Sequence, residues 1–243
     1  MELLGHTKLS VNINKIATIR NARGGNNPDV VQWAKKIESY GAQGITVHPR
    51  PDQRHIRFDD VYKLREIVTT EFNIEGYPSE DFISMVTEIC PQQVTLVPDA
   101  PDAITSDHGW DTKKHGDRLK DIISRFHESG IRCSIFLDPE PGMVESAART
   151  GTDRIELYTE AYAKGYHSNR EQAIKPYTDT AKMAAEAGLG LNAGHDLDLH
   201  NLRYFASHVP GLLEVSIGHA LVCDALEYGM SNTVRMYLNA LRP

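Results

Sequence analysis

The sequence predicts an α/β barrel made of eight strand–helix units, and three observations support this fold class. Short apolar segments alternate with stretches of helical periodicity along the whole chain of 243 residues. Each strand is separated from the next by enough chain for a helix, which is the spacing of a parallel sheet. No linker rich in Pro, Gly or Ser divides the chain. We therefore expect one domain over residues 1–243, a (βα)8 TIM barrel with extra helices.

The predicted strands and helices follow one another in regular order. The strands are Leu9–Ile13, Gly44–Val47, Asn73–Glu75, Gln93–Val97, Arg132–Leu137, Arg154–Leu157, Gly190–Asn192 and Glu214–Ile217. Helical patterns occupy 28–42, 58–72, 79–90, 117–130, 141–150, 170–188, 199–207, 220–228 and 231–241. Asp29, Ser79 and Ser231 stand at helix starts, and glycines follow helix ends at 41, 130, 151 and 188.

The main alternative is an open, doubly wound sheet. Such a sheet usually carries a Gly-rich phosphate-binding turn after its first strand. The segment that follows here, NINKIATIRNARGG, has no such fingerprint. The closed barrel is therefore favoured.

Charge and cysteine content restrict the function classes. The formal net charge of −7 argues against a general nucleic-acid binder. No apolar run reaches the roughly 20 residues of a membrane span, and no signal-peptide core is present. The three cysteines form no CxxC pair, which favours a reducing, cytoplasmic setting. The charge is uneven, because residues 1–65 hold 11 Lys and Arg against 6 Asp and Glu, and a local basic surplus attracts anions.

Alternation along the strands sorts their side chains into two faces. One face is apolar and should pack against the helices. The other is polar: Ser10, Asn12, Asn14, Thr46, His48, Asn73, Glu75, Thr95, Ser134, Asp138, Arg154, Glu156, Asn192 and Ser216. Branched apolar side chains normally fill a barrel interior. The polar face therefore predicts either an internal hydrogen-bond network or, as we favour, a polar cavity at the carboxyl ends of the strands.

Titratable groups stand in or just after these strands. They are His48, Glu75, Glu156, His195 and His219. Histidines and desolvated carboxyl groups exchange protons near neutral pH, so the set is typical of general acid–base catalysis. Glu156 lies deeper, where a negative charge stabilises a cationic intermediate or keeps a histidine protonated.

A divalent metal site is the competing interpretation of the same residues, since three histidines and a carboxylate suit such an ion. Against it, the first strand ends on Asn12-x-Asn14 instead of the His-x-His of metal-dependent amidohydrolase-type barrels. The histidines also come from separate strands. We therefore expect catalysis without a metal.

Two regions are candidates for binding anions. Gly194 and Gly218 stand beside strand ends just before helices, where backbone N–H groups bind phosphate, although glycine also serves tight turns. A second region follows the first two strands and carries Arg20, Arg23, Arg50, Arg54, His55 and Arg57; the alternative is a solvated basic loop. Two phosphate sites would suit two phosphorylated substrates or one bisphosphate. The long segment 97–116 resembles a lid, whose Thr105 and Ser106 would reach a phosphate on closing.

Longer motifs stand at the predicted strand ends in unbroken order. They are VNINKIATIRNARGG (11–25), GITVHPRPDQRHI (44–56), NIEG (73–76), LVPDAPDAITSDHGWD (96–111), IELYT (155–159), LNAGHDL (191–197) and IGHALV (217–222). With these motifs the chain resembles the pyridoxine 5′-phosphate synthase family of deoxyxylulose-dependent vitamin B6 biosynthesis. The resemblance implies a (βα)8 barrel assembled as a homo-octamer of dimers. It also implies condensation of 1-deoxy-D-xylulose 5-phosphate with 3-amino-2-oxopropyl phosphate, without metal or organic cofactor.

The resemblance further implies a role for each motif residue. His48 and Glu75 would accept protons, and His195 would donate one. Glu156 would stabilise charged, imine-type intermediates. The residues that would hold deoxyxylulose phosphate are Asn14, Lys15, Arg50, His55 and Thr105. Those that would hold the amino-ketone phosphate are Asn12, Arg23, Asp196, Gly218 and His219.

Three positions, in two motifs, depart from the family pattern. Asn14-Lys15 replaces an Asp-His pair, which exchanges a switchable imidazole for a fixed cation. Asp196 stands where a glycine is common. A carboxylate there repels a phosphate unless it turns outward.

Two other functions stay open on the sequence alone. One is another phosphosugar enzyme on the same fold, such as an aldolase, epimerase or isomerase. A class I aldolase needs an inward lysine at a strand end, and alternation turns its one candidate, Lys15, away from the face of Asn14. The other is a catalytically silent binding barrel, which would not need the histidine and glutamate constellation.

Overall fold

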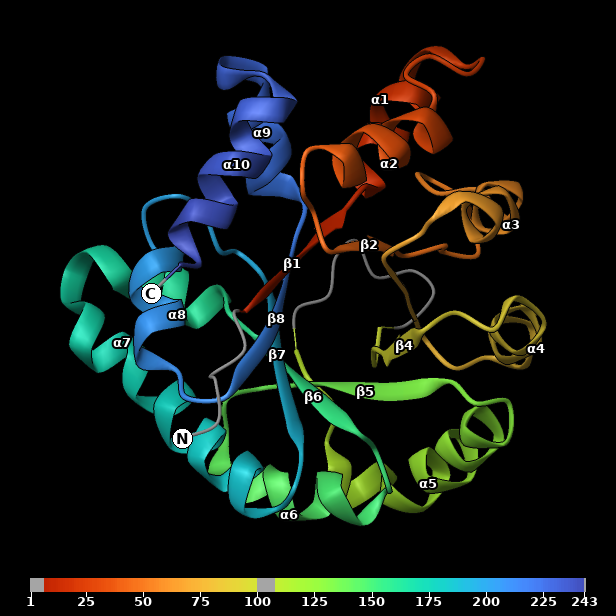
Figure 1. The fold of residues 1–243 in the computed structure, drawn as a ribbon. Coiled ribbons are helices and arrows are strands. Elements are labelled where there is room, and N and C mark those ends of the chain that lie inside the picture. The colour runs from red at the N-terminus through yellow and green to blue at the C-terminus, as the bar shows by residue number, and fades with distance from the viewer. Residues whose placement is uncertain (1–6, 100–107, 243) are drawn as a thin grey trace.

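Eight parallel strands close into a barrel in the computed structural model, which describes residues 7–99 and 108–242 (Figure 1). The strands pair in chain order, and β8 pairs with β1. They are β1 (Lys8–Asn12), β2 (Gly44–Val47), β3 (Glu71–Gly76), β4 (Gln93–Leu96), β5 (Arg132–Leu137), β6 (Arg154–Tyr158), β7 (Gly190–His195) and β8 (Leu212–Ile217). The predicted (βα)8 TIM-barrel fold is therefore confirmed.

Helices surround the strands on the outside of the barrel (Figure 1). They are α1 (Asn14–Arg23), α2 (Val30–Ser39), α3 (Phe58–Ile67), α4 (Glu80–Ile89), α5 (Thr112–Glu128), α6 (Pro141–Arg149), α7 (Glu160–Glu186), α8 (Leu202–His208), α9 (His219–Tyr228) and α10 (Met230–Ala240). The first crossover contains both α1 and α2, and α10 follows α9, so the extra helices are present. Across residues 7–99 and 108–242, no helix combines the length and apolar character needed to cross a bilayer.

Local sequence signals set several helix ends. Asp29 caps α2 by accepting a hydrogen bond from the Gln32 N–H at 3.0 Å, and Ser79 caps α4 in the same way. The glycines at 41, 130, 151 and 188 all have positive φ, as expected after helix ends. The predicted cap at Ser231 is wrong, because α10 begins at Met230 with Gly229 as its N-cap.

Two helical segments were not predicted. The first is α1, which begins at Asn14, so this residue does not continue the inward face of the first strand. The second is the first part of α7, before Asn169, where φ of −159° and ψ of 87° break the helix. The Asn169 side chain accepts from the Gln172 N–H at 3.0 Å and so caps the second part, which matches the predicted 170–188 helix.

The two faces of the strands separate as the alternation predicts. Outward side chains such as Val11 are fully buried between strands and helices. Inward polar side chains form a buried network, in which Ser10 Oγ lies 2.7 Å from Thr46 Oγ1. Thr95 Oγ1 donates to Asn73 Oδ1 at 3.1 Å. Hydrogen bonds between inward side chains thus link β1 to β2, β2 to β3 and β3 to β4.

This network accounts for only part of the polar face. Among the described residues, Ser134 Oγ, Asn192 Nδ2 and Ser216 Oγ are buried without a hydrogen-bond partner. Stability alone does not explain such groups, because each carries a desolvation cost that a partner normally offsets. A functional reason for the polar interior is therefore required.

Charged side chains close the N-terminal end of the barrel interior. Arg132 pairs with Glu71 and donates to Gln93 Oε1 at 3.0 Å. Arg154 Nη1 lies 3.8 Å from Glu71 Oε1 and donates to Asn192 Oδ1 at 3.2 Å. This end of the barrel therefore balances its own charges, whereas the carboxyl end carries the predicted site.

Arg20 links α1 to α3 and to the loop that precedes α3. Its Nη1 lies 2.6 Å from Asp60 Oδ1, and its Nη2 donates to the His55 carbonyl at 3.0 Å. Both members of this ion pair are buried. Arg20, predicted as part of an anion site, is thus engaged in a structural pair.

Replacing Asp60 should test the strength of this contact. Asp60→Ala leaves the Arg20 guanidinium buried without its counter-ion, so we expect a loss of about 3–5 kcal/mol in the free energy of unfolding. Urea denaturation measures it. Asp59→Ala is the matched control, since Asp59 is exposed in the same helical turn and should cost less than about 1 kcal/mol. Equal losses in the two variants would contradict the assignment.

Candidate active site

The titratable residues predicted from the sequence meet at the carboxyl mouth of the barrel. His48 directly follows β2, Glu75 lies in β3, Glu156 lies in β6, and His195 ends β7. The charges of Glu156 and Glu75 act on each other, as do those of His195 and His48. The structure therefore places in one cluster side chains that lie up to about 150 residues apart.

Two asparagines tie the beginning of α1 to this cluster. Asn12 Nδ2 donates to Glu75 Oε2 at 3.3 Å, and its Oδ1 accepts from the Asn14 N–H at 3.0 Å. The Asn14 side chain in turn accepts from the His48 N–H at 3.0 Å. Both residues therefore position the first three strand ends relative to one another.

Burial favours the protonated form of the two carboxyl groups. The pKa of Glu75 is raised well above its ordinary value by burial, and then by the neighbouring charges of Glu156 and Asp99. Burial raises the pKa of Glu156 to about 7, although a hydrogen bond from Thr95 Oγ1 at 3.4 Å opposes the shift. Its other oxygen, Oε1, has no hydrogen-bond partner among the described residues. The pair thus holds protons at a pH where exposed glutamates hold none.

Gly194 makes room for the Glu156 carboxylate. A Cβ atom on Gly194 would stand 2.6 Å from Glu156 Oε1 and 2.9 Å from the Ser216 carbonyl oxygen. Any residue larger than glycine at position 194 would therefore displace the Glu156 carboxylate. This is a packing reason for glycine in the NAGHD motif, beside the predicted phosphate role.

Burial has the opposite effect on the histidines, because their charged form is the cation. The pKa of His48 is lowered by burial, and then by Arg50, His55 and His195. Burial lowers the pKa of His195 to about 4, against the opposing charge of Asp99. Both rings are therefore neutral at pH 7 and able to accept a proton.

The His195 ring is held between two aromatic side chains. Its centroid lies 4.7 Å from that of Phe136 and 5.4 Å from that of Tyr158. The backbone has a φ of 95°, which is unusual for a residue other than glycine. Its Nδ1 has no hydrogen-bond partner among the described residues. The aromatic contacts thus hold the ring in position, and Nδ1 is not engaged in a hydrogen bond within the described residues.

Asp99 belongs to the cluster and was not singled out from the sequence. It lies 2.6 Å from the Arg50 guanidinium, and both side chains are buried. A signal was present, because Asp99 follows the end of β4 by three residues, as Arg50 follows the end of β2. Equal offsets from the ends of alternate strands, here β2 and β4 on either side of β3, place side chains at the same height on the barrel.

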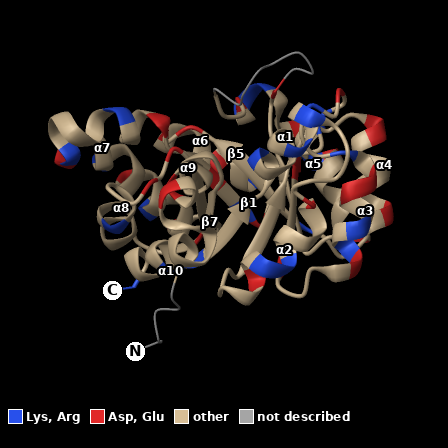
Figure 2. Cartoon of the chain, turned by 90° about the horizontal axis from the view of Figure 1, so that it is seen from above, with Lys and Arg blue, Asp and Glu red and all other residues tan. Residues whose placement is uncertain are grey.

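A basic region lies beside His48, as predicted. The pKa of His55 is lowered to about 4 by burial, and then by the charges of Arg50, Lys15 and Arg54. Arg23 ends α1 with an exposed side chain. Figure 2 marks the Lys and Arg positions of α1 in blue, and the buried Arg20 among them is already paired with Asp60. This concentration of positive charge suits a phosphate group.

The second predicted anion region lies where β8 leads into α9. Gly218 approaches Asn12 so closely that a Cβ atom would meet Asn12 Cβ at 3.0 Å. No side chain caps the first turn of α9, which begins at His219, so its N–H groups can bind an anion. Asp196 as a whole is exposed, but its carboxyl group is partly desolvated, and this desolvation, followed by the charge of Glu160, raises its pKa. Thr105 lies outside the described residues.

A cavity of about 400 Å³ opens beside the cluster. His48, Arg50 and Asp99 line one side of it. Its other walls are mostly apolar and come from α3, α4 and the loop before α4: Phe58, Tyr62, Tyr77, Phe82 and Met85. The cavity is large enough for a small phosphorylated molecule. Within residues 7–99 and 108–242, the side chains close enough to offer three ligands to one metal ion lie elsewhere.

Comparison with known proteins shows the family. The family model described as "Pyridoxal phosphate biosynthesis protein PdxJ" matches residues 9–243. The chain belongs to this family. A pyridoxine 5′-phosphate synthase of Cytophaga hutchinsonii is 62% identical over 236 residues, covering 97% of this chain and 99% of the relative. One of Christiangramia forsetii is 60% identical and covers 97% of this chain and 100% of the relative.

Solved structures with little sequence similarity share the fold. A tryptophan synthase from M. tuberculosis superposes with a TM-score of 0.65 at 11% identity, over 98% of this chain and 93% of that chain. A 4-hydroxy-2-oxoglutarate aldolase gives a TM-score of 0.65 at 14% identity, over 98% and 96%. At such identities the likeness concerns the barrel alone.

The raised pKa of Glu156 should be visible in the pH dependence of stability. Because the folded state favours the protonated carboxyl, this group's contribution falls as pH rises from about 4.5 through about 7. Glu156→Gln removes that loss, so urea denaturation at pH 8 should show a gain of about 3 kcal/mol. At pH 4.5 the two proteins should match.

Glu145→Gln is the control for this experiment, since Glu145 is exposed on α6. It should leave stability unchanged at both pH values. A gain in Glu156→Gln that is the same at pH 4.5 and pH 8 would exclude titration as its cause.

Proposed function

We propose that this protein is a pyridoxine 5′-phosphate synthase. It condenses 1-deoxy-D-xylulose 5-phosphate with 3-amino-2-oxopropyl phosphate to give pyridoxine 5′-phosphate, phosphate and water. The observation that carries the proposal is the family match over residues 9–243, with His48, Glu75 and His195 meeting at the barrel mouth. The reaction needs no metal or organic cofactor in this proposal.

Two phosphate groups are to be held in this reaction, and two regions support them. The basic region of Lys15, Arg50 and His55 suits the phosphate of deoxyxylulose phosphate. The uncapped start of α9, with Gly218 and His219, suits the phosphate of the amino ketone. In this proposal Asn12 and Arg23 also bind the amino-ketone phosphate. Asn14 and Thr105 also bind deoxyxylulose phosphate.

Condensation begins when the amine nitrogen attacks a carbonyl carbon, which requires loss of an amine proton. A neutral His48 is ready to take that proton at pH 7, because burial and its cationic neighbours keep its pKa low. Water then leaves as the imine forms, and the departing oxygen must be protonated. His195 supplies that proton in our proposal once the charge of a bound phosphate has raised its pKa.

The two glutamates respond to the cation that imine formation creates. Glu156 has a pKa near 7, so a cationic intermediate beside it draws it into the ionised form, which then stabilises the cation. Burial and the neighbouring carboxyl groups favour the protonated form of Glu75. It serves as a proton acceptor only after the same positive charge has lowered its pKa. In this proposal the charge of the reacting substrate thus brings Glu156 and Glu75 into the ionised form that the reaction needs.

The oligomeric state and the cellular location do not follow from the candidate active site. A homo-octamer of dimers stays a prediction from the resemblance, and a cytoplasmic location stays a prediction from the cysteine content. Asp196 turns its side chain toward solvent, which is compatible with phosphate binding through its backbone neighbours. No membrane or nucleic-acid partner is part of the proposal.

A reconstituted reaction tests the activity. Protein dialysed against a chelator is mixed with both substrates, and pyridoxine 5′-phosphate is followed by chromatography with fluorescence detection. Product should form without added metal, and its absence would overturn the proposal. Borohydride with a ketose phosphate should leave Lys15 unlabelled; a label there would favour a class I aldolase.

Removing a proton-transfer group should slow turnover sharply. We expect His48→Ala and Glu75→Gln each to lower kcat by about 10²-fold or more, the usual contribution of general acid–base catalysis. His208→Ala and Glu145→Gln are matched controls, because both residues are exposed on outer helices. Steady-state rates near the wild-type value in His48→Ala would exclude its role.

A further inference from the structure

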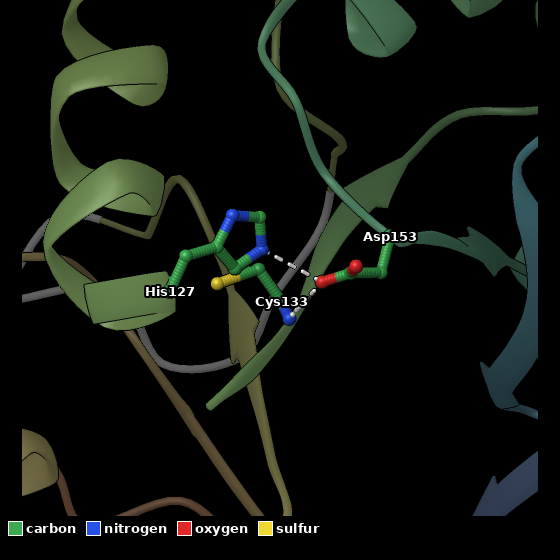
Figure 3. A group of neighbouring side chains, drawn as sticks. All are labelled: His127, Cys133 and Asp153. Carbon is green, nitrogen blue, oxygen red and sulfur yellow. Dashed lines mark hydrogen bonds and ion pairs between the residues drawn. The ribbon is translucent and has the colours of Figure 1, made fainter. Parts of the chain in front are cut away.

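Three side chains with metal-binding chemistry meet outside the candidate active site (Figure 3). His127 comes from the last turn of α5, Cys133 from the beginning of β5, and Asp153 from the loop before β6. Their ligand atoms all lie within 4.8 Å of one another. All three stand at the N-terminal end of the strands, the end opposite the barrel mouth.

Two of the three ligand atoms, His127 Nε2 and Asp153 Oδ2, already stand close to the spacing of a metal site. Asp153 Oδ2 lies 2.9 Å from His127 Nε2 and accepts a hydrogen bond from the Cys133 N–H at 2.8 Å. In a tetrahedral zinc site, nitrogen and oxygen ligands stand ~3.3 Å apart. The His127 and Asp153 side chains are 40% and 41% exposed. They can therefore separate by the few tenths of an ångström that an ion between them requires.

The choice of donors points to a particular class of ion. A thiolate, an imidazole and a carboxylate suit Zn²⁺ or Co²⁺, whereas Mg²⁺ and Ca²⁺ prefer oxygen ligands alone. Hydrogen bonding alone needs only the Asp153 carboxylate, which can accept from His127 Nε2–H and from the Cys133 N–H. The Cys133 thiol has only a weak contact with the Ile131 carbonyl at 3.8 Å, so metal binding gives it a stronger partner.

We propose that His127, Cys133 and Asp153 bind one zinc ion, with water as the fourth ligand. The ion joins α5 to β5 and to the loop before β6, so its role is to stabilise this end of the barrel. On binding, the thiol releases its proton to solvent. Because a thiol must lose its proton to bind the ion, zinc affinity should increase with pH.

Metal titration of the full chain, free of any histidine tag, tests the site. Protein stripped with a chelator should bind one Zn²⁺ per chain by calorimetry. Co²⁺ should give the near-ultraviolet thiolate charge-transfer band. At a free zinc concentration of about 100 times Kd, Tm should rise by about 5 °C.

Variants assign the binding to these residues. Cys133→Ser should abolish the cobalt band, and Asp153→Asn and His127→Gln should each weaken zinc binding at least about tenfold. Asn at position 153 still accepts from the Cys133 N–H, so the fold is retained. Cys223→Ser is the control, because Cys223 Sγ lies 3.6 Å from His219 Nε2 and forms a second thiol–imidazole pair.

The control variant should bind zinc as the unmodified chain does. Failure to bind one ion per chain, binding that survives Cys133→Ser, or a cobalt band lost in Cys223→Ser would each overturn the proposal. None of these readouts depends on turnover, so the outcome is independent of the proposed function.

Discussion

Exclusion of water from the barrel interior is the constraint on which the candidate site depends. Parallel strands force alternate side chains into a shared interior, and here that interior receives carboxyl groups. Burial then decides their protonation, because an ionised carboxylate loses its hydration while a neutral one loses little. Glu75 and Glu156 keep protons for this reason, and His48 and His195 lose theirs for the same reason. One physical cause thus prepares donors and acceptors together.

The segment from Asn12 to Arg23 connects this chemistry to the architecture. Asn12 and Asn14 contact Glu75 and His48, whereas Arg20, two turns further on, forms a buried pair with Asp60. A displacement of α1 would therefore reach the cluster through hydrogen bonds to the first three strand ends. The helix acts as a positioning element, although most of its length lies outside the barrel.

The barrel and most of the site could be predicted because their signals are local. Alternation within a strand shows which residues face inward, and a strand end shows which of them reach the mouth. The signals failed where a partner lies far along the chain. Arg20 has the sequence context of a free cation, and nothing near it indicates Asp60, 40 residues away.

Two further failures have the same origin. Asp99 gains its place from Arg50, 49 residues earlier, so its importance is visible only once the strands are aligned. α1 was missed because its buried face combines Ile16 and Ala17 with the cation Arg20, which weakens the apolar stripe that identifies a helix. In both cases the local signal is weak, and it can be interpreted only when the distant partner, Arg50 for Asp99 and Asp60 for Arg20, is known.

The opposite pKa shifts of the buried carboxyl groups and the buried histidines affect the pH at which the fold is most stable. Buried carboxyl groups such as Glu156 and Glu214, with pKa values of about 7 and 8, reduce stability as pH rises above about 4.5. The histidines, His55 and His195 among them, reduce it as pH falls below about 6.5. Between these limits the two trends oppose each other and leave a plateau. The fold is therefore most durable in mildly acidic solution, below the pH at which Glu156 ionises, so storage and assay call for different buffers.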